Sequence, residues 1–91
     1  MLPLKLQRLT QALREGGLWA ERHSYSIRIM YHEKFVASLH LYPLHGEAVM
    51  RLYSDEEPVN DYVLNAVRKA LQQHFPELRL HFSKLKRPRL S

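Results

Sequence analysis

Apolar residues near the start of the chain recur at the spacing of one helical face. The stripe consists of Leu2, Leu6, Leu9 and Leu13, three or four residues apart. Pro3 is tolerated in a first helical turn, because the N–H that it lacks would have no helical partner there. Gly16 and Gly17 follow the stripe, and a glycine can adopt the positive φ of a helix C-cap. The pattern predicts a helix over residues 2–15.

From residue 25 to residue 53 the apolar positions alternate with other positions, which is the period of a β-strand. The alternation comes in three runs, at residues 25–31, 35–42 and 47–53. The connections between the runs are short, and the second contains Pro and Gly, which favour turns. The pattern predicts three strands of an antiparallel meander.

The segment 54–57, Ser-Asp-Glu-Glu, predicts the start of a second helix. Ser54 would be the N-cap, and Glu57 would complete a capping box with it. The acidic side chains also suit the positive end of the helix dipole. A broad apolar face continues until Pro76, which ends the helix. Alternation over residues 78–82 then predicts a short fourth strand.

The predicted order of elements is therefore α-β-β-β-α-β. This order gives an α+β fold, a two-layer sandwich in which both helices cover one face of an antiparallel meander. Because each element reverses the chain, the fourth strand should run parallel to the first or to the third strand, and the pattern does not choose between them. Residues 1–83 form one predicted domain, and residues 84–91 form a basic, flexible C-terminal tail.

Alternation also assigns side chains to the two faces of the sheet. The face toward the helices is predicted to hold Ile27, Ile29, Phe35, Ala37, Leu39, Leu41, Ala48, Met50, Leu52, Leu78, Leu80 and Phe82. The opposite face, called the open face below, is predicted to hold Ser26, Arg28, Met30, Val36, Ser38, His40, Tyr42, Glu47, Val49, Arg51, Tyr53, Arg79 and His81. The open face would thus mix cations, imidazoles and aromatic hydroxyls with a few aliphatic side chains.

The net charge of +5 comes mostly from the last eight residues. This segment has no acid, and its cations are Lys84, Lys86, Arg87 and Arg89. Clustered cations bind phosphates through counterion release. A short basic tail is also often only a solubilising end. The charge therefore predicts a local electrostatic site and leaves the body of the domain nearly neutral.

Several classes of protein are disfavoured by composition. The chain has no cysteine, so it has neither disulfides nor thiolate metal sites. It also has no apolar run long enough to span a membrane. These features favour a cytoplasmic protein without a membrane partner. The six histidines do not form a paired metal-binding spacing on a helix, and the three glycines do not form a phosphate-binding loop. No metal, cofactor or catalytic residue is predicted, and an enzyme is the less favoured class.

Residues 9–29 begin Leu-Thr-Gln-Ala-Leu-Arg-Glu-Gly-Gly and continue through Arg22, His23 and Ser24 to Ile27. This opening and the α-β-β-β-α layout resemble small ribonuclease toxins and the double-stranded RNA-binding domains that share their frame. The Gly-Ser-His signature of the toxins is absent. The basic cluster that opens the second helix of the RNA-binding domains is replaced by acids in segment 54–57, which argues against binding of double-stranded RNA. The likeness is one of architecture.

Two functions fit the predicted open face, and the first is preferred. One is a non-enzymatic binding or regulatory module that contacts a protein partner, or a second copy as a homodimer, through this face. The alternative is a nucleic-acid-binding protein that uses the basic tail and the arginines of the face. The predicted site residues for either function are Arg28, His40, Tyr42, Arg51, Tyr53, Arg79, Lys84, Lys86, Arg87 and Arg89.

Two further interpretations remain open at this point. An ordinary solvated sheet, with Tyr and Val present for their β-propensity, would show the same composition. A small nuclease or toxin with His23 or His40 as general base is also conceivable, because imidazole suits proton transfer near neutral pH.

Overall fold

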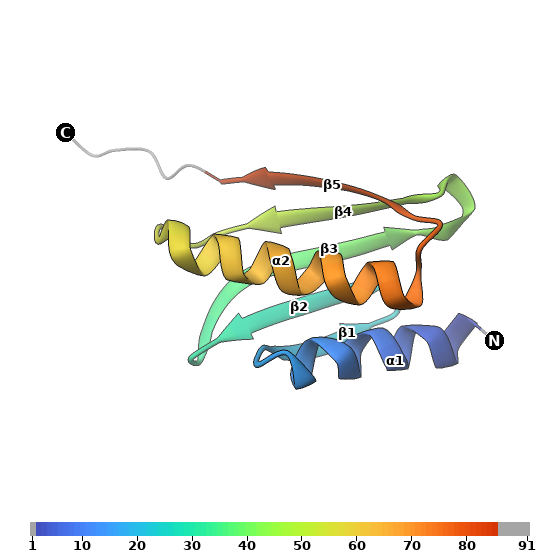
Figure 1. Ribbon diagram of the computed structural model, residues 1–91, viewed down its shortest axis with the longest axis horizontal. Helices are drawn as coiled ribbons and strands as arrows, with labels where there is room; N and C mark the ends of the chain where they lie inside the picture. The colour runs from blue at the N-terminus through green and yellow to red at the C-terminus, as the bar shows by residue number, and fades with distance from the viewer. Residues whose placement is uncertain (1, 86–91) are drawn as a thin grey trace.

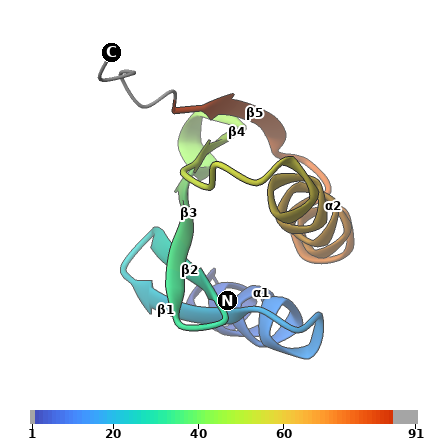
Figure 2. The ribbon, with the colours of Figure 1, turned by 90° about the vertical axis from the view of Figure 1, so that its left-hand side faces the viewer.

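Both helices lie on the same face of one mixed, curved sheet (Figures 1 and 2). The computed structural model describes residues 2–85. The elements in chain order are α1 (Leu2–Glu15), β1 (Trp19–His23), β2 (Ser26–Tyr31), β3 (Lys34–Tyr42), the 3-10 turn η1 (Pro43–His45), β4 (Glu47–Leu52), α2 (Glu57–His74) and β5 (Arg79–Lys84). The α+β two-layer fold predicted from the sequence, with helices on one face, is confirmed. Neither helix in the described part of the chain has the length and apolar content needed to cross a membrane.

The five strands lie in the order β1-β2-β3-β4-β5. The first four pair antiparallel, and β5 pairs with β4 in parallel. A parallel neighbour requires a crossover connection, and α2 provides it. Of the two positions left open by the sequence pattern, β5 therefore takes the one beside the last strand of the meander.

Strand β1 was not predicted, and it makes the order of elements α-β-β-β-β-α-β. It is an edge strand in which only Ala20 is buried, so the apolar alternation that marks a strand is missing. Ala20 lies opposite Ile29 of β2. On the other side the Arg14 side chain donates from Nε to the Ala20 carbonyl at 2.9 Å. Pairing with β2 and this contact to α1 hold a segment whose own sequence has little strand signal.

The predicted glycine cap of α1 is confirmed. Gly17 has a φ of +94°, which L-residues with a side chain rarely adopt. The Gly17 N–H donates to the Arg14 carbonyl and the Leu18 N–H donates to the Leu13 carbonyl, which is the Schellman pattern. The Tyr62 hydroxyl of α2 donates to the Gly16 carbonyl at the same place. The glycines therefore end α1 and also let α2 approach it closely.

The predicted capping box of α2 is wrong. The helix begins at Glu57, and the Ser54 hydroxyl accepts from the Glu56 N–H at 3.0 Å in a turn before the helix. If Ser54 were the N-cap, Pro58 would occupy the fourth helical position, where its missing N–H would break the first helical hydrogen bond. With the observed start, Pro58 falls in the first turn, where its missing N–H costs no helical hydrogen bond. The buried Asn60 amide donates to the Ser54 carbonyl at 3.0 Å and holds the turn against the helix.

A β-bulge in β3 overturns two of the face assignments. Ile29 lies opposite Ala37, but Met30 lies opposite Phe35, so Val36 is the extra residue. Such an insertion exchanges the faces of the residues beyond it. Phe35, predicted to face the helices, is 46% exposed, and Val36, predicted for the open face, is 4% exposed.

The other inward assignments largely hold. The residues confirmed as buried are Ile27, Ile29, Ala37, Leu39, Leu41, Ala48, Met50, Leu52 and Leu78. Leu80 is partly buried against this core. Phe82 remains 42% exposed, because β5 is the edge strand, and the Arg68 guanidinium lies 5.4 Å from its ring centroid. The core thus ends before the outer half of β5.

Leu39→Ala tests the core. Leu39 is fully buried in the central strand, so its truncation should lower the free energy of unfolding by about 2–5 kcal/mol, from lost burial and an unfilled cavity. Urea melts measure the loss, and His40→Ala at the next position, on the open face, is the control. His40→Ala should cost less than half as much. Equal losses, or a larger loss at His40, would mean that the face assignment of β3 is reversed.

Val36→Asp and Phe35→Asp test the bulge. A carboxylate at position 36 would be buried without a partner and should cost several kcal/mol of stability. The same substitution at position 35 should be tolerated, since Phe35 is half exposed. Thermal melts compare the stabilities of the two variants. The low β-propensity of Asp affects both equally, because both positions lie in β3. A more damaging substitution at Phe35 would show that β3 continues without a bulge.

Candidate functional site

Cross-strand pairing arranges the side chains of the open face in rows, because directly opposite residues point to the same side of a sheet. One row across all five strands consists of His23, Ser26, His40, Val49 and His81. The next row consists of Glu21, Arg28, Ser38, Arg51 and Ser83. The face therefore places a row that contains imidazoles beside a row that contains guanidinium groups.

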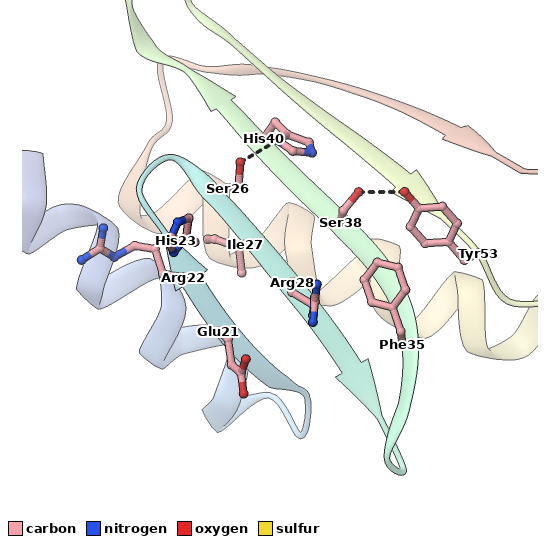
Figure 3. Close-up of a pocket in the computed structure, with 10 residues that line it drawn as sticks. All are labelled: Glu21, Arg22, His23, Ser26, Ile27, Arg28, Phe35, Ser38, His40 and Tyr53. Atoms are coloured by element: carbon pink, nitrogen blue, oxygen red, sulfur yellow. Dashed lines mark hydrogen bonds between the residues drawn. The ribbon is translucent and has the colours of Figure 1, made fainter.

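A hollow of about 510 Å³ lies over β1, β2 and β3 and reaches Tyr53 after β4 (Figure 3). Its wall includes His23, Ser26, Arg28, Phe35, His40 and Tyr53. Figure 3 shows Arg28 between the two histidines on one side and the two aromatic rings on the other. The hollow thus combines a permanent cation, titratable rings and flat apolar surfaces.

Hydrogen bonds hold two of the rings in place. The Ser26 hydroxyl and His40 Nδ1 are 2.7 Å apart, which leaves Nε2 as the ring nitrogen that can reach a ligand. The hydroxyls of Ser38 and Tyr53 are 3.1 Å apart. Both contacts join neighbouring strands, so the positions of the rings follow from the register of the sheet.

The aromatic part of the hollow is a pair of rings. The centroids of Phe35 and Tyr53 lie 4.8 Å apart with an interplanar angle of 31°. The Arg28 guanidinium carbon lies 5.6 Å from the Phe35 centroid, within the range of a cation–π contact. Because Phe35 is half exposed, this arrangement offers an apolar ring face and a cation to the same ligand.

Negative charge is sparse on the open face. Of the acids, Glu21 and Glu47 lie on strands of this face; Glu21 accepts a 2.9 Å hydrogen bond from the Trp19 indole, and Glu47 lies 3.8 Å from His81 Nε2. The other acids lie on helices or in turns, and they are Glu15, Glu33, Asp55, Glu56, Glu57, Asp61 and Glu77. Among residues 2–85, no ion pair involves an arginine of this face. The open face therefore carries three arginines, Arg28, Arg51 and Arg79, against two glutamates.

The structure brings together four of the predicted site residues and separates others. Arg28, His40, Arg51 and Tyr53 lie in or beside the hollow. Tyr42 and Arg79 belong to a different row at the far end of the face, where Glu47 lies between them. Three predicted site residues lie outside the described residues, and they are Lys86, Arg87 and Arg89. The expected flexibility of the tail concerns the same segment.

Lys84 is the last residue of β5, and it contacts an acid of α2. Its Nζ lies 2.5 Å from Glu57 Oε2. This hydrogen bond raises the pKa of the Lys84 ammonium and lowers the pKa of the Glu57 carboxyl. The charge of Lys84 is thus compensated locally, and Lys84 contributes little to the cationic character of the open face.

Sequence reasoning missed two contributors to this region, Phe35 and Trp19, and named His23 only as a candidate general base. Phe35 was assigned to the core because the bulge was not recognised; the run of three apolar residues at positions 35–37, which breaks the alternation, was the available signal. His23 and Trp19 were not placed on the sheet because β1 was not predicted. His23 and His40, the two candidates for a general base, both line the hollow.

Metal binding receives no support from the described part of the chain. Within residues 2–85, no group of three or more His, Asp or Glu side chains could hold a metal ion. His40 and His81 share a row, but Val49 of the intervening strand lies between them. At ordinary strand spacing the two backbones are about 10 Å apart.

Comparisons with protein-family models, with curated proteins and with solved structures gave no match to this chain. The chain also has four strands between its helices, where the double-stranded RNA-binding layout has three. Function must therefore be argued from the geometry of the open face.

Proposed function

We propose that the protein binds single-stranded nucleic acid across its open face. The observation that carries this proposal is the hollow in which Arg28, Phe35 and Tyr53 lie together. Proteins that bind single strands combine aromatic side chains, on which bases stack, with cations that contact the backbone. The half-exposed ring of Phe35 offers a surface for a base, and the Arg28 guanidinium beside it has no ion pair within residues 2–85 and can contact a phosphate.

The bulge favours this function over the protein contact preferred from the sequence. The protein interpretation relied on Met30, Val36 and Val49 as aliphatic residues on the open face. Val36 is in the core, and Met30 and Val49 are half-buried. Phe35 takes the place of Val36 on the face, so the face loses aliphatic surface and gains aromatic surface next to Arg28. That change supports stacking with bases more than packing against an apolar partner.

The row that contains Arg28 and Arg51 gives a path for the strand. Ser38 lies between these two arginines in the cross-strand register, so the guanidinium groups are separated by two strand spacings, about 10 Å. Such a spacing suits contacts to separate phosphates of an extended strand.

Phe35→Ala and Arg51→Ala test this function. Fluorescence anisotropy with labelled oligo-dT and oligo-U of about 12 nucleotides measures affinity at several salt concentrations. Phe35→Ala should weaken binding by about 1–3 kcal/mol, the usual contribution of one stacked base. Arg51→Ala should weaken binding and make it less sensitive to salt, by about one phosphate contact.

Arg8→Ala is the matched control, since Arg8 is an exposed arginine on α1, on the other side of the molecule. It should leave affinity nearly unchanged. An absence of binding to either oligonucleotide at low salt would refute the proposal. A loss for Arg8→Ala as large as that for Arg51→Ala would show that only net charge matters.

A second candidate, contact with another copy of this chain, is favoured by an apolar surface at one end of the sheet. Leu44 in η1 is 98% exposed, and it borders a hollow of about 340 Å³ whose wall also includes Tyr25, Leu41, Tyr42 and Pro43. An exposed cluster of this kind is typical of contact surfaces.

Leu44→Asp tests this second candidate. Light scattering coupled to gel filtration, at high protein concentration, should give the mass of a dimer for the parent chain and of a monomer for the variant. The folded state should be unaffected, because Leu44 buries almost no surface. A monomer for the parent chain at every concentration would rule out the dimer.

A further inference from the structure

One part of the hollow is not explained by base stacking. His23 and His40 are each paired with Ser26 in the cross-strand register, so the two imidazoles flank a small side chain from the neighbouring strands on either side. Arg28 follows on the same strand and the same face, two residues after Ser26. Figure 3 shows these four side chains around one end of the hollow.

We propose that this end of the hollow is a phosphate-binding subsite, formed by Arg28, His23 and His40, for one phosphodiester of the bound strand. The inference rests on the proposed function and deepens it. It assigns the Phe35–Tyr53 pair to a base and the Arg28–histidine end to a neighbouring phosphate. Binding through this subsite strengthens as the solution becomes more acidic.

The Ser26 hydroxyl orients the His40 ring toward the hollow. His40 Nδ1 is 2.7 Å from the Ser26 hydroxyl, which can accept a hydrogen bond from a charged ring or donate one to a neutral ring. Ser26 therefore holds the ring in either charge state and leaves Nε2 for the ligand. Ser26 acts as a positioning residue, because it orients His40 without itself being required to reach the phosphate.

The charged side chains that line the hollow favour an anion. From β1 the hollow is lined by Glu21, Arg22 and His23, from β2 by Arg28, from β3 by His40, and beyond β4 by Tyr53. Glu21 is the one acid of the lining among the described residues, and its Oε1 accepts from the Trp19 indole. An anion in the hollow therefore meets the permanent cation of Arg28 and two rings that can become cationic. Arg22 lies in the row of the inward-facing Ile27, and its guanidinium donates to the Ser24 carbonyl at 3.1 Å.

Histidine is the side chain whose charge changes in the range between pH 5 and 8. A protonated ring donates a charge-assisted hydrogen bond to a phosphate oxygen, which is stronger than a neutral one. Because protonation adds positive charge on both sides of Ser26, affinity for the strand should rise as the pH falls. At a carboxylate site that binds a cation the pH dependence is the opposite. There affinity falls as the pH falls, because the carboxylate must be ionised.

The experiment measures affinity for the labelled oligo-U of the previous section at about pH 5.5 and about pH 7.5, at constant ionic strength. The parent chain should bind about tenfold more tightly at the lower pH. The double variant His23→Ala and His40→Ala should bind more weakly than the parent at both pH values and should lose most of the tenfold gain. Ser26→Ala should lose part of it.

His45→Ala is the matched control, because His45 is an exposed histidine in η1 outside this hollow. It should keep the full gain in affinity. Titration with inorganic phosphate, followed by NMR of the imidazole resonances, should shift those of His23 and His40 and leave those of His45 in place. The NMR spectrum also shows directly whether each variant is folded.

The outcomes separate this inference from the proposed function. Tight binding whose pH dependence is unchanged in the double variant overturns the subsite and leaves strand binding intact. Loss of the gain in His45→Ala as well, or equal phosphate-induced shifts at all three histidines, also overturns the subsite, since the effect is then one of net charge. No binding of the oligonucleotide at either pH overturns both proposals.

Discussion

The structure depends on the burial of one face of the sheet beneath two helices. The chain has no cysteine and no metal site in its described part, so burial of apolar surface must stabilise the fold. The core is one contiguous cluster, to which α1, α2 and every strand except the edge strand β5 contribute fully buried residues. β5 contributes Leu80, which is only partly buried. Because the two helices cover only one side of the sheet, the side chains of the other side remain available to a ligand.

The bulge in β3 links this core to the candidate site. Without it, continuous alternation would place Phe35 beneath the helices and Val36 on the open face. The inserted residue lets a small aliphatic side chain complete the core and leaves the aromatic ring outside, against Tyr53 and near Arg28. Bulges often change the direction of a side chain next to a functional site. Here the same local irregularity satisfies packing on one face and creates the stacking surface on the other.

The electrostatic character of the open face has a similar origin. Most acids lie on helices and turns, where Glu57 is paired with Lys84 and Glu77 is paired with Lys5. The strands carry arginines and histidines outward, and those arginines have no ion pair among residues 2–85. A nearly neutral domain can thus present guanidinium groups without ion pairs on one face. Composition alone, which pointed to the C-terminal segment as the basic feature, does not reveal this arrangement.

Much of the fold was determined by local patterns. The leucine stripe of α1, the glycines that end it and the alternation of β2, β3 and β4 each depend on contacts within a few residues or on one buried face. These patterns were sufficient for the α+β class, for the burial of Leu39 and for the placement of Arg28, His40, Arg51 and Tyr53 on the open face. Their period is a property of the chain itself, so it can be read without a structure.

Tertiary contacts decided the rest. β1 is a strand because β2 and Arg14 hold it, not because its own residues alternate. α2 begins at Glu57 because Pro58 cannot occupy an inner helical position. Phe35 reaches the open face because one residue is inserted between two pairs of the β2–β3 ladder, a choice made by packing against the helices. His23, His40 and Arg28 meet because three consecutive strands fall into one register. That register is set by the two-residue turns together with the side chains that fill the shared core, and the second of these becomes visible only in the tertiary structure.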